Sequence, residues 1–199
     1  MPSIVQDGTA LFLKRWLRRP FAMGAVMPSG PWLTHKIART TLAALKGRDG
    51  HVVELGAGTG EVTRALLAVG IPAARLAVIE RDPELSAFLH RRFSGPRIIE
   101  GDAARLRQLL SRNGVEQVAA VVSGLPLLSL PADIVNGIVT GVFDVLPPGG
   151  EMVQFTYGPA PPVPRELRDG LRLEARRVGR VWRNVPPAVV WTFSQPVRP

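Results

Sequence analysis

The 199-residue sequence has no cysteine, a single tyrosine and only three histidines. Without cysteine the chain has no disulfide, no thiolate metal ligand and no cysteine nucleophile, which fits a reducing cytosol. The histidines His35, His51 and His90 are far apart and do not form a cluster with the spacing of metal ligands. We therefore expect neither a metal site nor a disulfide framework.

Long apolar runs are also missing. The uncharged stretch 117–132 is interrupted by Gly124, Pro126 and Pro131, and it is shorter than the roughly 20 apolar residues that a membrane span needs. The N-terminus lacks the basic, apolar and small-residue order of a signal peptide. A hydrophobic content of 46% at this length instead predicts one compact, cytoplasmic domain with a sizeable core, which we expect to be a monomer.

The net charge of +9 is unevenly distributed along the chain. Residues 1–50 have eight basic and two acidic groups (+6), residues 51–150 have nine and ten (−1), and residues 151–199 have eight and four (+4). Basic ends around a neutral middle indicate a cationic surface for a polyanion, either nucleic acid or an anionic membrane.

Leu11–Arg19 (L-F-L-K-R-W-L-R-R) is typical of an amphipathic helix. Its apolar face has Phe12, Leu13, Trp16 and Leu17, and its opposite face has Lys14, Arg15, Arg18 and Arg19. Such a helix binds anionic membranes, with about 1 kcal/mol from each basic residue near the surface. The alternative is that Phe12 and Trp16 pack on the core of the domain.

From His51 onward, expected strands and helices alternate. We expect strands at 51–55, 75–80, 97–100, 117–122 and 150–157, and helices at 60–69, 83–93, 103–112 and 131–145. A further helix is expected from Pro31 to about Lys46, and two tail strands at 171–181 and 187–194. Such alternation predicts a doubly wound α/β fold with a mostly parallel sheet, here seven-stranded and twisted, with helices on both faces and a C-terminal antiparallel hairpin.

The first expected strand ends in H-V-V-E-L-G-A-G-T-G, just before a helix. Glycines allow a tight turn and a close approach of the backbone to a ligand. Gly56, Gly58 and Gly60 occupy every second position and follow the acidic Glu54. A carboxylate beside this loop suits a cationic sulfonium better than a diphosphate, so the pattern favours S-adenosylmethionine (SAM) over a dinucleotide.

Two further carboxylates follow the next strands. Glu80 ends the second strand, where it can accept hydrogen bonds from both ribose hydroxyls. Asp102 follows the third strand, where it can accept from the adenine amino group. Each acid alone could be a helix cap, but their order on consecutive strands predicts a SAM site.

With these features the sequence resembles the class I SAM-dependent methyltransferases, which have a Rossmann-like fold. More narrowly, it resembles the soluble bacterial phospholipid N-methyltransferases. The resemblance rests on the amphipathic N-terminal helix and on the motifs G-A-V-M-P-S-G, V-V-E-L-G-A-G-T-G, V-V-S-G-L-P-L, Q-F-T-Y-G-P and V-W-R-N-V-P-P-A-V-V-W.

The resemblance implies stepwise methylation of phosphatidylethanolamine toward phosphatidylcholine, with SAM converted to S-adenosylhomocysteine and no metal. It implies peripheral attachment to the inner face of the cell membrane, and a contact of Ser29 with the methionine part of SAM. Residues 1–47 would form the membrane-binding helix and lid, and residues 48–199 the methyltransferase domain, within one globular unit.

The acceptor amine is expected beside the fourth strand, where V-S-G-L-P-L-L follows. Ser123 and the carbonyls around Gly124 and Leu125 can accept hydrogen bonds from the amine there, and Ser123 also lies beside the expected sulfonium. Pro126 fixes φ and has no N–H group. The alternative is a plain strand-to-helix turn that contains a proline.

Two further segments provide candidates. Tyr157 ends the fifth strand, where its hydroxyl can contact the amine or phosphate or relay a proton, unless it only packs on the rim. Arg183 and Asn184 lie in the turn of the tail hairpin, where arginine can bind the lipid phosphate bidentately. A solvated loop arginine is the alternative.

Three rival functions remain. An enzyme that dimethylates N6 of a ribosomal RNA adenine normally stacks the flipped base on an aromatic, whereas Leu127 and Leu128 offer no such platform and suit an entrance for acyl chains. We therefore expect a phospholipid partner and no nucleic acid. Ornithine lipid is another possible acceptor, and a non-catalytic SAM- or lipid-binding protein is the third alternative.

Overall fold

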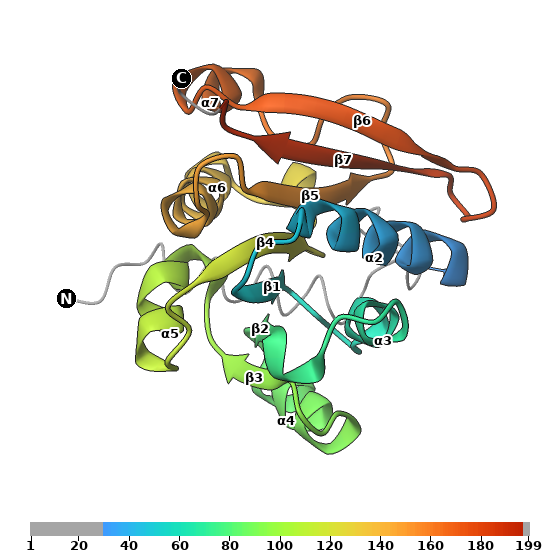
Figure 1. The fold of residues 1–199 in the computed structure, drawn as a ribbon. Coiled ribbons are helices and arrows are strands. Elements are labelled where there is room, and N and C mark those ends of the chain that lie inside the picture. The colour runs from blue at the N-terminus through green and yellow to red at the C-terminus, as the bar shows by residue number, and fades with distance from the viewer. Residues whose placement is uncertain (1–29, 197–199) are drawn as a thin grey trace.

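The computed structural model describes residues 30–196, and its strands form one sheet in the order β3-β2-β1-β4-β5-β7-β6 (Figure 1). The strands are β1 (His51–Leu55), β2 (Leu76–Glu80), β3 (Arg97–Glu100), β4 (Val118–Ser123), β5 (Glu151–Thr156), β6 (Glu174–Val181) and β7 (Ala188–Ser194). The α-helices are α2 (Pro31–Leu45), α3 (Glu61–Ala68), α4 (Pro83–Arg92), α5 (Leu106–Arg112), α6 (Ala132–Val145) and α7 (Arg165–Gly170).

The five strands β1 to β5 are parallel, and the inner strands β1, β2 and β4 are mostly apolar, with a carboxylate or a hydroxyl near the carboxyl end of each. All residues of β2 (L-A-V-I-E) and β4 (V-A-A-V-V-S) are buried. Strands covered on both faces need apolar side chains in both directions, which explains these continuous runs. The structure confirms the expected α/β fold with a mostly parallel seven-stranded sheet.

The sheet separates two hydrophobic cores, each covered by its own helices (Figure 1). Val53 and Leu55 face the core that contains residues of α5 and α6. Val52 faces the other core, to which α2 contributes Leu33 and Ile37. Side chains of a strand alternate between the two faces of its sheet, so β1 serves both cores.

The C-terminal hairpin is antiparallel, as expected, and continues the sheet beyond β5. Because β7 is antiparallel to both β5 and β6, β6 runs in the same direction as β5. The turn between β6 and β7 therefore lies at the edge of the sheet where the parallel strands have their carboxyl ends.

Helix α7 was not predicted from the sequence, and the strand expected from residue 171 begins only at Glu174. A helix of six residues is too short to show a periodic apolar face. Its end is fixed by a hydrogen bond from the Leu173 N–H to the Arg168 carbonyl (2.7 Å). The proline-rich segment P-A-P-P-V-P at 159–164 leads directly into this helix.

The amphipathic helix expected at 11–19 and Ser29 lie outside the described residues. Helix α2 shares its core with β1 and β4, so the described part of 1–47 packs as one unit with the rest. Among residues 30–196, no helix is both long and apolar enough to cross a membrane.

Candidate active site

The carboxyl ends of β1, β4 and β5 lie side by side at one edge of the sheet. Leu55 pairs with Ser123, and Ser123 pairs with Gln154 on β5. The Gly124 N–H donates to the Leu55 carbonyl (2.8 Å), and the Gly56 N–H donates to the Ile79 carbonyl (2.8 Å). The strand hydrogen bonding therefore continues into the loops that follow β1 and β4. The predicted glycine loop after β1 and the predicted acceptor loop after β4 lie next to each other.

The three glycines of the first loop all have positive φ, at +68° for Gly56, +57° for Gly58 and +81° for Gly60. A Cβ on Gly56 would lie 2.4 Å from Leu125 Cδ2, and one on Gly60 would lie 2.5 Å from Phe93 Cε2. A Cβ on Gly58 would meet nothing within 4 Å. Gly56 and Gly60 are therefore required by packing as well as by conformation, whereas Gly58 borders open space.

Glu80 binds this loop with its carboxylate. Its Oε2 accepts a hydrogen bond from the Gly58 N–H (2.8 Å), and its Oε1 accepts from the Asp82 N–H (2.9 Å). Glu80 is buried, so the two bonds fix both oxygens. A carboxylate has about four lone-pair sites, which leaves capacity for the predicted contact with ribose hydroxyls.

Glu54 lies almost fully buried at the end of β1. Its Oε2 accepts a hydrogen bond from the Thr63 hydroxyl of α3 (2.6 Å). Burial raises the pKa of Glu54 from 4.5 to about 7; the Thr63 hydrogen bond lowers it in part, and the negative charge of Glu80 raises it further. A carboxylate that is desolvated and lies next to another acid is stabilised by a cation, which fits the charge of SAM.

Arg92 of α4 fixes the start of α3. Its Nη1 donates to the Thr59 carbonyl, and its Nη2 lies 2.9 Å from Glu61 Oε1. Hydrogen bonds from Arg64 and then Arg92 lower the pKa of the Glu61 carboxyl. The end of the glycine loop is thus held by contacts on the surface as well as by packing.

Asp102 lies where expected, directly after β3, and its Oδ1 accepts from the Ala104 N–H (3.0 Å) as a helix cap. Its Oδ2 lies 3.6 Å from Arg81 Nη1. The cap uses one oxygen, and the contact with adenine stays a prediction.

The acceptor loop is held by a residue that the sequence analysis did not single out. Gln154 is 1% exposed, and its Nε2 donates to the carbonyls of Leu125 and Phe155 (both 3.0 Å). The Leu125 carbonyl also accepts from the Leu127 N–H (2.9 Å). With two hydrogen bonds accepted, this carbonyl is the least available of the acceptors that we expected for the amine.

The other loop residues take different positions. Ser123 is buried, and its hydroxyl oxygen accepts a hydrogen bond from the Leu125 N–H (3.3 Å). Leu127 is buried in the core with α6, whereas Leu128 is 65% exposed. The expectation that both leucines line an entrance is wrong for Leu127, because the short 3-10 turn Leu127–Ser129 directs it inward.

Tyr157 directly follows β5, and its ring contacts Phe155 edge to face (5.7 Å between centroids). Both side chains pack against the core on the α2 and α3 face. Tyr157 therefore lies on the same side of the sheet as Glu54, whereas its role in proton transfer stays a prediction.

Arg183 and Asn184 lie in the turn between β6 and β7. The Arg183 guanidinium lies over the Trp32 ring of α2, with 4.8 Å from Cζ to the centroid. Asn184 is buried, its Oδ1 accepts from the Gly30 N–H (2.9 Å) and its Nδ2 donates to the Pro186 carbonyl (2.8 Å). Both ends of this amide are thus used inside the protein, which leaves Arg183 as the better candidate for an anionic head group.

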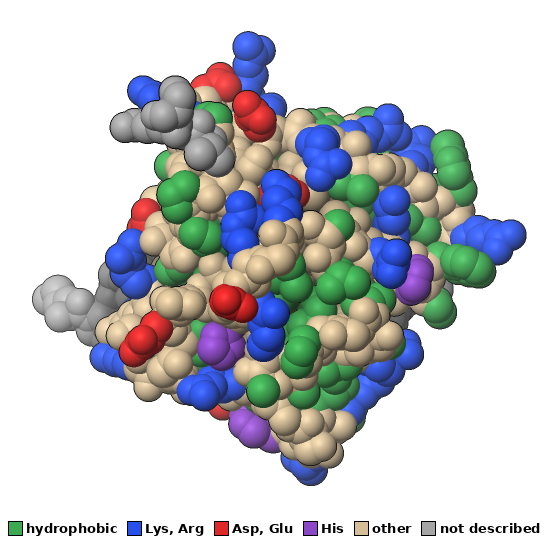
Figure 2. All heavy atoms as spheres, viewed as in Figure 1, with side chains coloured by type: hydrophobic (Ala, Val, Ile, Leu, Met, Phe, Trp, Pro, Cys, Tyr) green, Lys and Arg blue, Asp and Glu red, His purple; other side chains and the backbone are tan. Residues whose placement is uncertain are grey.

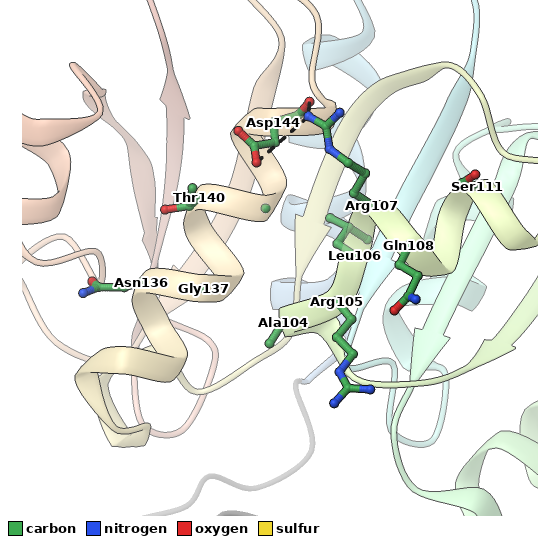
Figure 3. Close-up of a pocket in the computed structure, with 11 residues that line it drawn as sticks. Ala104, Arg105, Leu106, Arg107, Gln108, Ser111, Asn136, Gly137, Thr140 and Asp144 are labelled. Atoms are coloured by element: carbon green, nitrogen blue, oxygen red, sulfur yellow. Dashed lines mark hydrogen bonds and ion pairs between the residues drawn. The ribbon is translucent and has the colours of Figure 1, made fainter. Parts of the chain in front are cut away.

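A groove of about 730 Å³ lies between α5 and α6, on the face of the sheet opposite α2 and α3 (Figure 3). Arg107 reaches across it and donates from Nη2 to the Asp144 carbonyl (2.8 Å). None of the predicted cofactor residues within 30–196 lines this groove. The groove is therefore separate from the predicted cofactor site at the glycine loop, where open space borders Gly58 and the buried carboxylates of Glu54 and Glu80 lie close by.

Within the described residues, no group of three or more His, Cys, Asp or Glu side chains is placed to hold a metal ion.

Comparison with known proteins gives a sequence relative that covers most of the chain, although no protein-family model matches. The chain is 37% identical over 153 residues to the ornithine lipid N-methyltransferase of Singulisphaera acidiphila, which covers 75% of this chain and 78% of that protein. A shorter match, 37% identical over 100 residues, relates 48% of this chain to 35% of the ribosomal RNA small subunit methyltransferase A of Synechococcus sp..

Solved structures show the same fold. The crystal structure of the glycopeptide N-methyltransferase MtfA in complex with SAM is similar with a TM-score of 0.60 and 15% sequence identity, over 82% of this chain and 94% of that chain.

The close contact at Gly56 gives a first prediction. The substitution Gly56→Ala forces a Cβ against Leu125 in a left-handed conformation, which costs roughly 1–2 kcal/mol before any clash. We expect SAM affinity, measured by calorimetry, to fall about tenfold or more. Gly70→Ala is the matched control, because Gly70 has φ +96° but nothing within 4 Å of its Cβ. Equal affinities of the two variants would contradict the assignment of this loop.

The buried Glu54 gives a prediction about pH. Because its native pKa of about 7 lies above the ordinary 4.5, the native state keeps a proton that the unfolded chain has lost between these values. The native state is therefore destabilised as pH rises from 4.5 to about 7, and fully so above 7. We expect Glu54→Gln to gain stability relative to the parent over this window, in urea unfolding at pH 5, 6, 7 and 8.

Glu61→Gln is the control for this series. The pKa of Glu61 is lowered, so its carboxylate stabilises the native state above pH 4.5. Glu61→Gln should therefore lower the free energy of unfolding, whereas Glu54→Gln should raise it. A stability difference of Glu54→Gln that does not change between pH 5 and 8 would show that Glu54 is not protonated in the native state.

Gln154 gives a prediction about positioning. Gln154→Leu removes one of the two hydrogen bonds to the Leu125 carbonyl and frees the acceptor loop. We expect kcat to fall about tenfold or more, since small misplacements of reacting groups are costly, while SAM affinity stays within twofold. Gln195→Leu is the matched control, because Gln195 Nε2 donates to the Leu171 carbonyl (3.1 Å), away from the acceptor loop. A normal kcat for Gln154→Leu would show that the position of the acceptor loop does not affect the rate of methyl transfer.

Proposed function

The chain belongs to the class I SAM-dependent methyltransferases, in the family of the ornithine lipid N-methyltransferase, and we propose that it methylates the amine of a membrane lipid head group. The observation that carries the proposal is the 37% identity over 78% of that relative. Ornithine lipid is the first candidate acceptor on this ground. Phosphatidylethanolamine is the second, because of the motifs that the chain shares with phospholipid N-methyltransferases.

SAM supplies a methyl group that is already activated on a sulfonium sulfur. In the transfer, a nitrogen–methyl bond forms as the sulfur–methyl bond breaks, and the products are S-adenosylhomocysteine and the methylated amine. The task of the protein is to hold a neutral amine lone pair about 3 Å from that carbon. An alkyl ammonium must first lose a proton, which passes to a nearby acceptor or to water.

The residues proposed for the cofactor include Gly56, Gly58 and Gly60 of the glycine loop. Glu54 and Glu80 provide negative charge for the cationic ligand, and Gly58 leaves open space for it. Asp102 and Ser29 complete the proposed set. Glu80 already binds the Gly58 N–H (2.8 Å), so the loop and this carboxylate are aligned before the ligand arrives.

For the acceptor amine we propose the Ser123 hydroxyl and the Gly124 carbonyl as hydrogen-bond acceptors. The Leu125 carbonyl is a weaker candidate because it already accepts from Gln154 and Leu127. Tyr157 is proposed to contact the amine or relay its proton.

Arg183 is proposed to bind the anion of the head group. Phosphatidylethanolamine has a phosphodiester beside its amine, and ornithine lipid has a carboxylate, and both suit a guanidinium. The Arg183 guanidinium is positioned by a cation–π contact with Trp32, in which Cζ lies 4.8 Å from the ring centroid. A cation held at the carboxyl edge of the sheet can thus orient either lipid.

The substrate lies in a membrane, which requires docking. We propose that residues 11–19 bind the anionic inner surface as an amphipathic helix, through their basic and apolar faces. RNA methylation is less favoured, since the ribosomal RNA methyltransferase match covers only about a third of that relative and the acceptor loop has no aromatic side chain.

A labelled-methyl assay tests the function. With radioactive SAM, we expect label in the lipid fraction of anionic vesicles that contain ornithine lipid or phosphatidylethanolamine, and none in ribosomal RNA. Vesicles with one aminolipid each identify the acceptor, and chromatography of the head groups counts the methyl groups. Replacement of Lys14, Arg15, Arg18 and Arg19 by glutamate should reduce the rate on vesicles, as should high salt.

Gly56→Ala is the negative control, because its weakened SAM affinity should lower the rate when SAM is limiting. If the radioactive methyl group appears in the RNA and not in the lipid fraction, the proposal is wrong and the substrate is a nucleic acid. No turnover of any aminolipid or RNA by a protein that binds SAM would indicate a non-catalytic role.

A further inference from the structure

Exposed hydrophobic side chains gather where the turn between β6 and β7 meets the first turn of α2. Trp182 and Val185 in the turn are 69% and 74% exposed, and Trp32 in α2 is 55% exposed. They are three of the five large hydrophobic side chains that the described residues leave exposed. We call Trp32, Arg180, Trp182, Arg183 and Val185 the hairpin patch.

The hairpin patch is anchored rather than loose. Asn184, in the middle of the turn, is 4% exposed and accepts a hydrogen bond from the Gly30 N–H, directly before α2. A Cβ on Gly30 would lie 3.0 Å from this amide oxygen, so the two segments are in tight contact. The exposed side chains therefore project from a fixed base formed by two elements.

Each tryptophan of the patch has an arginine over its ring. Cζ of Arg180 lies 4.8 Å from the ring centroid of Trp182, and Cζ of Arg183 lies 4.8 Å from that of Trp32. Cation–π contacts of this kind place a positive charge over the face of an apolar ring. The patch thus combines hydrophobic surface with positive charge.

The two segments that form the patch have an excess of basic residues, although Lys46 and Arg176 contact Glu151 of β5 (2.6 and 3.6 Å). Residues 30–46 contain three Lys or Arg and residues 175–196 contain four, and neither segment contains Asp or Glu. Lys36 of α2 adds its charge beside Gly179 of β6 (3.7 Å from Cε to a built Cβ). Figure 2 shows hydrophobic and basic side chains together at the right-hand edge, where Figure 1 places the hairpin turn and the start of α2.

The patch lies at the carboxyl edge of the sheet. The turn after β6 is at this edge because β6 runs parallel to β5. Helix α2 begins here too, since the Gly30 N–H before it is bonded to Asn184 of that turn. Gly58, Ser123 and Tyr157 follow strands that end at the same edge. A surface bound to the hairpin patch therefore lies beside the candidate active site.

We propose that the hairpin patch is a second membrane-docking surface, which inserts Trp32, Trp182 and Val185 among the head groups of an anionic bilayer. The inference rests on the proposed function. Tryptophan concentrates at membrane interfaces because its ring is apolar and its N–H is polar, and arginines beside it attract anionic lipids. Docking here, together with residues 11–19, turns the carboxyl edge toward the lipid substrate.

Single-stranded nucleic acid also binds aromatic and arginine side chains. The aliphatic Val185 at the tip favours lipid instead, because an exposed aliphatic side chain gains by insertion into an apolar layer and has no ring on which a base can stack. The expected ligand is therefore the bilayer, and preferential binding of RNA would contradict the proposal.

Vesicle binding by the full-length protein tests the proposal. We expect Trp182→Ala/Val185→Ala to weaken co-sedimentation with phosphatidylcholine–phosphatidylglycerol (7:3) vesicles about tenfold. Brominated lipids should quench the fluorescence of the parent more than that of the variant. The matched control is Phe88→Ala, which removes another exposed aromatic under an arginine, with Arg92 Cζ 5.9 Å from its ring centroid, on α4.

Unchanged vesicle binding of Trp182→Ala/Val185→Ala would overturn the proposal and assign docking to residues 11–19 alone. Equal weakening by Phe88→Ala, or tighter binding to single-stranded RNA than to vesicles through the same side chains, would overturn it as well.

Activity on lipid dispersed in detergent separates this inference from the proposed function. Docking on a bilayer is not needed there, so Trp182→Ala/Val185→Ala should turn over dispersed aminolipid within twofold of the parent while its rate on vesicles falls. No turnover by the parent in detergent would instead contradict the proposed function. An equal loss in detergent and on vesicles would place the two side chains in catalysis and overturn the docking role.

Discussion

The loops that leave β1 and β4 press against each other, and the geometry of the candidate site depends on this contact. A Cβ on Gly56 would collide with Leu125, and a Cβ on Gly124 would lie 2.8 Å from the Gly56 carbonyl oxygen. Neither glycine can be replaced without moving the other loop. Because one loop is proposed to hold the methyl donor and the other the acceptor, the contact that packs them also sets the distance between donor and acceptor.

The negative charge of the Glu54 carboxylate is costly because the side chain is buried. Glu54 is almost fully buried, and its raised pKa shows how strongly the site disfavours its charged form. The Thr63 hydroxyl offsets only part of that cost. Groups with perturbed pKa values concentrate at functional sites, and here the perturbation suits a cationic ligand, which would restore the carboxylate to its charged form.

The proposed orientation at a membrane depends on the direction of the strands. Parallel strands bring all their carboxyl ends to one edge, and the antiparallel pair β7 and β6 returns the chain so that its turn reaches the same edge. The hairpin patch and the candidate site therefore lie at the same edge of the sheet.

The sequence by itself determined the fold class, because buried parallel strands show as apolar runs and glycine, Glu80 and Asp102 mark the ends of consecutive strands. It also placed Glu80 beside the candidate cofactor loop, since the carboxyl ends of neighbouring parallel strands must share an edge, and the Gly58 N–H donates to its carboxylate. It missed α7, which is too short for a periodic pattern, and Gln154, whose role depends on a contact between β5 and a loop 29 residues earlier. Three features come from the tertiary structure alone: Leu127 is buried, the Asn184 amide is used within the protein, and the Arg183 guanidinium lies over the Trp32 ring. These outcomes depend on which segments distant in sequence touch, and no local pattern records that.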